Sequence, residues 1–245
     1  MIKTLLLTFV VALLVGCAPT LVPHIAYLPV IREKGQAEAR VSTGFNGSEL
    51  QVGYQVTDKL VVHSALLTHG RSRANNKFRS ADLGLGYYYN SPNGFWRLGG
   101  HVGAAYGGGN SGDGQCFECV DPVPTSTYSV RYTYAYAQPT VLYLDGVQTW
   151  GFGLRVSQAY YHRFTERRAE ALGGPANLTD YAGRRSAFIQ PTFQYGHRVS
   201  RWLTLSGTFG AQRFLGSPAR IDDMRQFIGQ VGIHFVVSKR TAPQP

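Results

Sequence analysis

The stretch 80–89, SADLGLGYYY, alternates between apolar residues and small or polar ones. One face collects Ala81, Leu83, Leu85, Tyr87 and Tyr89, and the other collects Ser80, Asp82, Gly84, Gly86 and Tyr88. Neighbouring side chains on a β-strand point to opposite sides of the sheet, so a period of two indicates a strand between two environments. The stretch therefore predicts a strand with one continuous apolar face.

Nine further segments are predicted as strands. Eight of them have this period, and the segment at 60–68 is mixed. They lie at about 37–45, 50–57, 60–68, 96–107, 132–144, 150–157, 189–195, 203–212 and 226–237. Short connections alternate with longer ones along the chain, which is typical of an up-and-down arrangement. The sequence predicts an all-β fold, an antiparallel transmembrane barrel of about ten strands.

The composition agrees with such a fold. Charged residues make up 16 % of the chain, against roughly 25 % in a typical soluble domain. There are 29 Gly, 15 Tyr and 13 Phe, and a content of aromatics this high with few charges excludes disorder. The only long apolar run, 4–15, is shorter than the roughly 20 residues that a membrane-spanning helix needs.

The beginning of the chain resembles the signal peptide of bacterial lipoproteins. A basic start is followed by the apolar run and by Leu14-Val15-Gly16-Cys17, which is similar to a lipobox. The resemblance implies removal of residues 1–16 and acylation of Cys17, with palmitate among the acyl chains. Ordinary secretion with an incidental Cys17 is the alternative. Because Ala18 rather than Asp follows the cysteine, the resemblance favours the outer membrane.

After the predicted signal peptide, the Pro-containing stretch 17–34 is interpreted as a tether and 35–238 as the barrel, followed by a tail at 239–245. The segment 25–28 could also pack on the body of the protein. Trp96, Trp150 and Trp202 each follow a short turn, as expected for aromatic residues at one membrane interface. The segments together resemble the outer-membrane β-barrel class. A soluble periplasmic lipoprotein barrel is the alternative.

The resemblance to this class implies a location and partners. We expect the cell outer membrane, with both termini periplasmic and the long loops extracellular. The final strand, with Gln230, Gly232, Phe235 and Val237, is similar to the signal read by the barrel-assembly machinery. The net charge is +10, but no basic helix is present, so we expect no nucleic-acid partner. The predicted partners of a monomer are membrane lipid and lipopolysaccharide phosphates facing the arginines near the long loops.

Several charged residues fall on the small and polar faces, which a membrane barrel turns toward its lumen. These are Glu38, Arg40, Asp82, Arg97, His101, Arg155 and His234. A hairpin turn near 92–93 would put Asp82 opposite Gly103 and diagonal to His101, an arrangement that a general base could use. The alternative is an ion-paired polar network that fills the lumen.

Ten is also the strand number of the outer-membrane aspartyl-protease family. The paired-acid and Asp-His motifs of that family are not matched residue by residue, so its activity is not carried over. We expect a non-enzymatic protein that is structural, adhesive or in contact with lipopolysaccharide. An enzyme acting on lipid or peptide at the outer rim and a narrow channel are the alternatives.

Cys116 and Cys119 lie in the longest Gly-rich connection. In an exported protein the default for two nearby cysteines is a local disulfide. A zinc site would need two further ligands at metal spacing, which the neighbouring sequence lacks. We expect no cofactor and no metal.

Overall fold

The computed structural model describes residues 21–44, 47–71, 76–112, 126–168, 177–215 and 226–237. Eleven strands occur there: β1 (Ala37–Gly44), β2 (Gly47–Gln55), β3 (Leu60–Arg71), β4 (Asn76–Asn90), β5 (Trp96–Gly112), β6 (Ser126–Leu144), β7 (Gln148–Arg168), β8 (Asn177–Asp180), β9 (Arg185–Ser200), β10 (Leu203–Leu215) and β11 (Gln226–Val237). Within these ranges no helix is long and apolar enough to cross a membrane.

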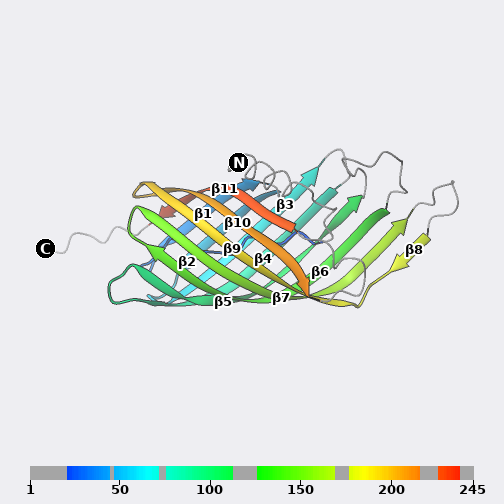
Figure 1. Ribbon diagram of the computed structural model, residues 1–245, viewed down its shortest axis with the longest axis horizontal. Coiled ribbons are helices and arrows are strands. Elements are labelled where there is room, and N and C mark those ends of the chain that lie inside the picture. The colour runs from blue at the N-terminus through cyan, green and yellow to red at the C-terminus, as the bar shows by residue number, and fades with distance from the viewer. Residues whose placement is uncertain are drawn as a thin grey trace, which may run out of the picture.

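The sheet closes on itself through the first and last strands. β1 pairs antiparallel with β11 from Ala37↔Val237 to Gly44↔Gln230, and the other neighbours follow in chain order. β8 pairs only with the end of β7, whose next neighbour in the ring is β9. The closed barrel therefore has ten antiparallel strands, as the period-two segments predicted (Figure 1).

The two ends of the barrel differ. Short turns join β2 to β3, β4 to β5, β6 to β7 and β9 to β10 at one end, on the left in Figure 1. At the other end the rim is uneven, because β1 and β2 have 8 and 9 residues whereas β6 and β7 have 19 and 21. The wall is thus low at the β1–β2 hairpin and high at β6 and β7.

Strands β5 to β7 extend further than the alternation predicted, into residues that we had assigned to long connections. β5 continues to Gly112, and β7 continues to Arg168. The extra length of β5 begins with Gly108 and Gly109, which have no side chains and hence no visible alternation. Backbone pairing there is nevertheless continuous with β4 and β6.

The burial pattern shows which face meets the lipid. Along β4 the apolar side chains point outward, with Leu83 68 % exposed, while Asp82 and Tyr88 point inward and are buried. The same inversion of a soluble protein's pattern recurs around the ring, where outward positions carry Val, Leu, Phe, Ile and Tyr. A continuous apolar surface of this extent is not tolerated in water, and it matches the apolar band of a membrane barrel.

An aromatic girdle marks the membrane interface at the short-turn end. Trp96, Trp150 and Trp202 are all exposed and lie in or directly after short turns. Their ring centroids lie 5.1 Å from Tyr143, 4.5 Å from Tyr195 and 6.3 Å from Phe235, respectively. Amphipathic rings at one level fit the boundary between hydrocarbon and headgroups.

We predict that Leu83→Arg hinders folding into a bilayer. Leu83 lies at the centre of β4 on the lipid face, where an arginine near the midplane costs about 2–4 kcal/mol. The free energy of unfolding, measured by denaturant titration in lipid vesicles, should fall by that amount. Asp58→Arg, in the exposed β2–β3 turn, is the matched control and should cost little. Equal losses in the two variants would contradict the lipid-facing assignment.

Candidate functional site

The N-terminal described segment, 21–31, lies inside the barrel. Every residue in it is buried, and even Val30 is only 6 % exposed. The prolines predicted a tether here. Residues 21–31 instead pack inside the barrel, where their apolar side chains and backbone groups contact the wall. Residues 21–31 are called the lumen segment below.

The lumen segment runs from the long-loop end to the short-turn end. Leu21 packs with Tyr161 and Phe188 in the cluster near the tall strands, and Val22 packs with Leu67 and Phe78. At the other end Ile31 packs with Leu144, the last residue of β6 before a short turn. The chain then reverses through 32–36, with Gly35 at φ 84°, and enters β1.

Two wall carboxylates accept hydrogen bonds from the backbone of the lumen segment. Glu49 on β2 accepts from the Ile25 amide at 3.1 Å, and its other oxygen lies 2.9 Å from His24 Nδ1. Glu38 on β1 accepts from the Val30 amide at 2.9 Å. These are charge-assisted bonds, which are stronger than bonds between neutral groups.

Wall side chains also donate to the carbonyl groups of the segment. Gln51 donates to Ile25 O at 3.0 Å, Gln138 to Tyr27 O at 2.9 Å, Gln190 to His24 O at 2.9 Å, Gln194 to Leu28 O at 3.3 Å, and Arg97 to Ile31 O. These donors come from four strands, β2, β5, β6 and β9. A buried backbone group without a partner costs about 1–3 kcal/mol, so this set holds the segment in one register.

Glycines in the wall make room for the side chains of the segment. A Cβ at Gly53 would overlap the Tyr27 hydroxyl, and a Cβ at Gly153 would lie 3.3 Å from Leu28 Cδ2. Gly151 is equally close, with Leu28 Cδ1 3.1 Å from its would-be Cβ. The inner surface is therefore shaped to Tyr27 and Leu28, and the Tyr27 ring also stacks on His63 at 4.4 Å.

A polar network lies beside the segment in the middle of the lumen. The Tyr136 hydroxyl donates to Asp82 Oδ1 at 2.7 Å and lies 3.0 Å from His63 Nε2. Arg155 donates to Asp82 Oδ2 at 3.3 Å and to Gln138 at 3.0 Å, with its guanidinium 4.0 Å from the centre of the Tyr136 ring. Asp82 and His63 are 3.5 Å apart, and both are almost fully buried.

All seven charged residues singled out in the sequence point into the lumen, but they do not form one network. They are Glu38, Arg40, Asp82, Arg97, His101, Arg155 and His234, all buried. Asp82 and Arg155 form the one direct ion pair among them in the described chain. Arg40 donates to Gln194 and Thr208, His101 lies beside the Tyr88 hydroxyl, and His234 lies 2.9 Å from Ser206.

The expected position of Asp82 opposite Gly103 is wrong. Asp82 pairs with Ala105, because the β4–β5 turn is centred at 93–94 rather than at 92–93. Ser91 and Trp96 close this turn, and Gly94 has φ 73°. The shift moves every cross-strand partner by two residues, and the histidine nearest to Asp82 is His63, not His101.

Sequence reasoning missed the residues that hold the lumen segment. Glu49, Gln51, Gln190 and Gln194 had been counted only as polar-face residues or left out, and His63 belongs to the mixed segment. Their roles become visible only once the segment lies in the lumen. Cys17, Cys116 and Cys119 lie outside the described residues, as do Arg73 and Arg220 among the arginines near the long loops. Within the described chain, no three His, Cys, Asp or Glu residues are grouped so that they could hold a metal ion.

Comparison with known proteins supports the fold alone. No protein-family model matches the sequence, and no curated protein matches it. Among solved structures, the outer membrane protease OmpT from Escherichia coli aligns with a TM-score of 0.50 and 9 % identity, covering 82 % of this chain and 90 % of that chain. The translocator domain of the autotransporter NalP from Neisseria meningitidis aligns with a TM-score of 0.43 and 15 % identity, covering 82 % and 86 %. The chain has the fold of an outer-membrane β-barrel.

The Asp82–Arg155 pair gives a test of the polar network. Asp82→Ala should lower the free energy of unfolding by about 3–5 kcal/mol, because it leaves Arg155 as an uncompensated buried charge. The double variant Asp82→Ala/Arg155→Met should recover part of this loss, since it removes both charges. Denaturant titration of the folded barrel measures both. A double variant less stable than the single one would contradict the pairing.

Proposed function

We propose that this protein is a lipid-anchored, non-enzymatic outer-membrane barrel that its own N-terminal segment keeps closed. Its role is to stay in the outer membrane and to present its long-loop end at the cell surface as a structural, adhesive or lipopolysaccharide-contacting platform. One observation carries the proposal: the lumen segment is buried and hydrogen-bonded to side chains from five strands of the wall. Such a segment is part of the folded core of the barrel.

The channel alternative is disfavoured by the same observation. A pore needs a continuous aqueous path along the barrel axis. Here the lumen contains the segment at 21–31. The large inward rings of Tyr132, Tyr134 and Phe188 belong to the same buried cluster as Leu21, at the long-loop end of the segment. Transport would require the whole segment to leave, which exposes Glu38 and Glu49 without their backbone partners.

The enzyme alternative has one geometric candidate, the group of Asp82, His63 and Tyr136. The distances suit proton transfer, as a general base lies about 2.6–3.2 Å from the group it serves. However, the Tyr27 ring stacks on His63, Asp82 and His63 each have about 1 % side-chain exposure, and Tyr136 is also buried. A substrate at the outer rim would not reach them. The network is better explained as packing that holds the lumen segment in place.

The direction of the lumen segment bears on the lipid anchor. Leu21 is at the long-loop end, and His24 contacts Glu49, the third residue of β2 from that end. Cys17 is four residues before Leu21, a separation that spans at most about 14 Å. We therefore propose that the acyl chains on Cys17 enter the leaflet next to the long loops, and not the periplasmic leaflet expected from the sequence.

The closed lumen can be tested by a designed disulfide. The Cβ atom of Ala26 lies 3.7 Å from the position of a Cβ at Gly153, within the 3.5–4.5 Å range of disulfides. In a Cys116→Ser/Cys119→Ser background, Ala26→Cys/Gly153→Cys should cross-link in the outer membrane, as read by mass spectrometry of the joined peptides. Ala26→Cys/Phe152→Cys is the control, because Phe152 faces lipid, and it should not cross-link.

The same variant then tests function. In planar bilayers the cross-linked and the reduced protein should both be non-conducting, whereas protein lacking 21–31 should conduct or fail to fold. Conductance by the wild type that the cross-link abolishes would show instead that the segment is a gate. That result would overturn the proposal of a permanently closed barrel.

The lipid anchor and its side of the membrane form a separate test. Cys17→Ser should abolish incorporation of radiolabelled palmitate and cleavage of 1–16. An epitope inserted after Ala18 should bind antibody on intact cells, whereas the same epitope after Ser238, next to the short-turn end, should bind only after permeabilisation. Detection of the first epitope only in permeabilised cells would contradict the proposed direction.

A further inference from the structure

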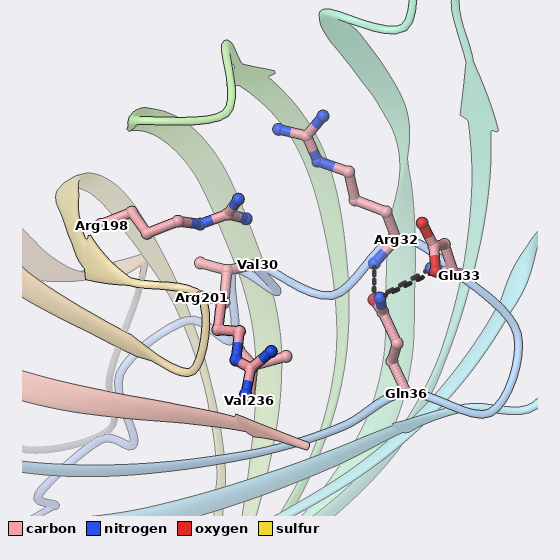
Figure 2. A pocket seen from close by; sticks show the side chains of 7 residues that line it. All are labelled: Val30, Arg32, Glu33, Gln36, Arg198, Arg201 and Val236. Atoms are coloured by element: carbon pink, nitrogen blue, oxygen red, sulfur yellow. Dashed lines mark hydrogen bonds between the residues drawn. The ribbon is translucent and has the colours of Figure 1, made fainter. Parts of the chain in front are cut away.

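The mouth of the barrel at the short-turn end contains a hollow of about 250 Å³. Its lining comes from both the chain that leaves the lumen and the barrel wall. Val30, Arg32, Glu33 and Gln36 belong to the former, and Arg198, Arg201 and Val236 belong to the β9–β10 hairpin and β11. Figure 2 shows Arg198 pointing toward Val30, with Arg32 on the opposite side and Arg201 beside Val236. Three guanidinium groups thus surround one cavity.

These cations lack acidic partners. Among the described residues, no carboxylate lies within ion-pair distance of Arg32, Arg198 or Arg201. The one lining acid, Glu33, accepts from Gln36 Nε2 at 3.2 Å, and Gln36 Oε1 in turn accepts from the Arg32 backbone amide at 2.8 Å (Figure 2). The nearby Asp145 caps its own turn by accepting from the Val147 and Gln148 amides.

The like charges around the hollow repel one another. Partial burial lowers the pKa of the Arg32 guanidinium, and the positive charges of Arg198 and Arg97 lower it further, while the negative charges of Asp145 and Glu33 offset only part of this. Arg32 Nε also has no hydrogen-bond partner in the described chain. An anion in the hollow would remove this repulsion and supply acceptors for the guanidinium groups.

We propose that this mouth is a binding site for a phosphate-bearing anion, which clamps the lumen segment to the barrel wall. Guanidinium groups bind phosphate oxygens through paired, charge-assisted hydrogen bonds. The lining carries three positive charges and one negative charge, an excess of two that matches a phosphomonoester at about −1.5 to −2 better than a carboxylate at −1. Val30 and Val236 offer an apolar side for the carbon part of an ester.

Two sources share this chemistry, a soluble phosphate ester and the headgroup of an anionic lipid. Trp202 follows Arg201 directly and belongs to the interfacial girdle, so the site is near the level of lipid headgroups. The phosphate site includes Arg32, directly after the lumen segment. It requires neither acylation of Cys17 nor the absence of catalysis.

The test uses folded full-length protein in octyl glucoside, a detergent without phosphate, at constant ionic strength. Inorganic phosphate and glycerol 3-phosphate should each raise the midpoint of thermal unfolding in a saturable way, and acetate should not. A parallel arm compares the protein in phosphatidylcholine vesicles with and without phosphatidic acid. Saturation by the soluble anions assigns a free phosphate ester, and stabilisation only by phosphatidic acid assigns a lipid headgroup.

Arg198→Gln/Arg201→Gln removes two cations from exposed positions without touching the lumen segment. It should raise the phosphate concentration at half-saturation at least tenfold, or abolish the stabilisation by phosphatidic acid. Lys59→Gln/Lys77→Gln removes the same charge elsewhere and should behave as the wild type. Equal responses of the two double variants, or no stabilisation in either arm, would overturn the site. The Ala26→Cys/Gly153→Cys cross-link reports separately on whether the lumen segment is in place.

Discussion

In a membrane no water reaches the backbone, so every amide and carbonyl group within the hydrocarbon must find its partner in the protein. This chain meets that requirement by pairing β1 with β11 over the full length of β1, which closes the ring of ten strands. Closure then forces alternate side chains to opposite environments. The outward set becomes apolar, and the inward set must fill a space that closure has created. The contents of the lumen follow from that second demand.

A barrel of about eight strands is just wide enough for its own side chains to fill, and each added strand widens it. With ten strands, this protein fills the remaining space with backbone. The lumen segment brings its own unpaired amide and carbonyl groups inside, which explains why the inward set contains so many Gln and Glu side chains. Wall glycines such as Gly53 and Gly153 provide the room that the segment needs. The lumen segment and the inner surface of the wall therefore depend on one another.

The strands could be read from the sequence because lipid and lumen impose a strict period of two on each of them. The short turns and the Trp positions were equally visible, since each depends on neighbouring residues. The lumen segment could not be read, because its partners come from five strands as far away as Gln190 and Gln194. Pro23 and Pro29 suggested a tether, because proline has no backbone N–H to pair with a neighbouring strand. Wall side chains hold this segment instead, so it does not need strand pairing.

The same physics limits how the lumen can be used. If the segment left, Glu38 and Glu49 would lose charge-assisted bonds to the Val30 and Ile25 amides, and water would have to enter to solvate them. Leaving in part is no easier, because Tyr27 is enclosed between His63 and Gly53. The mouth differs, because Arg32 meets Arg198 and Arg201 there, and Glu33 is the single acid in a lining with three guanidinium groups. Opening would begin there, and an anion at the mouth would act on the step that precedes any exposure of the lumen.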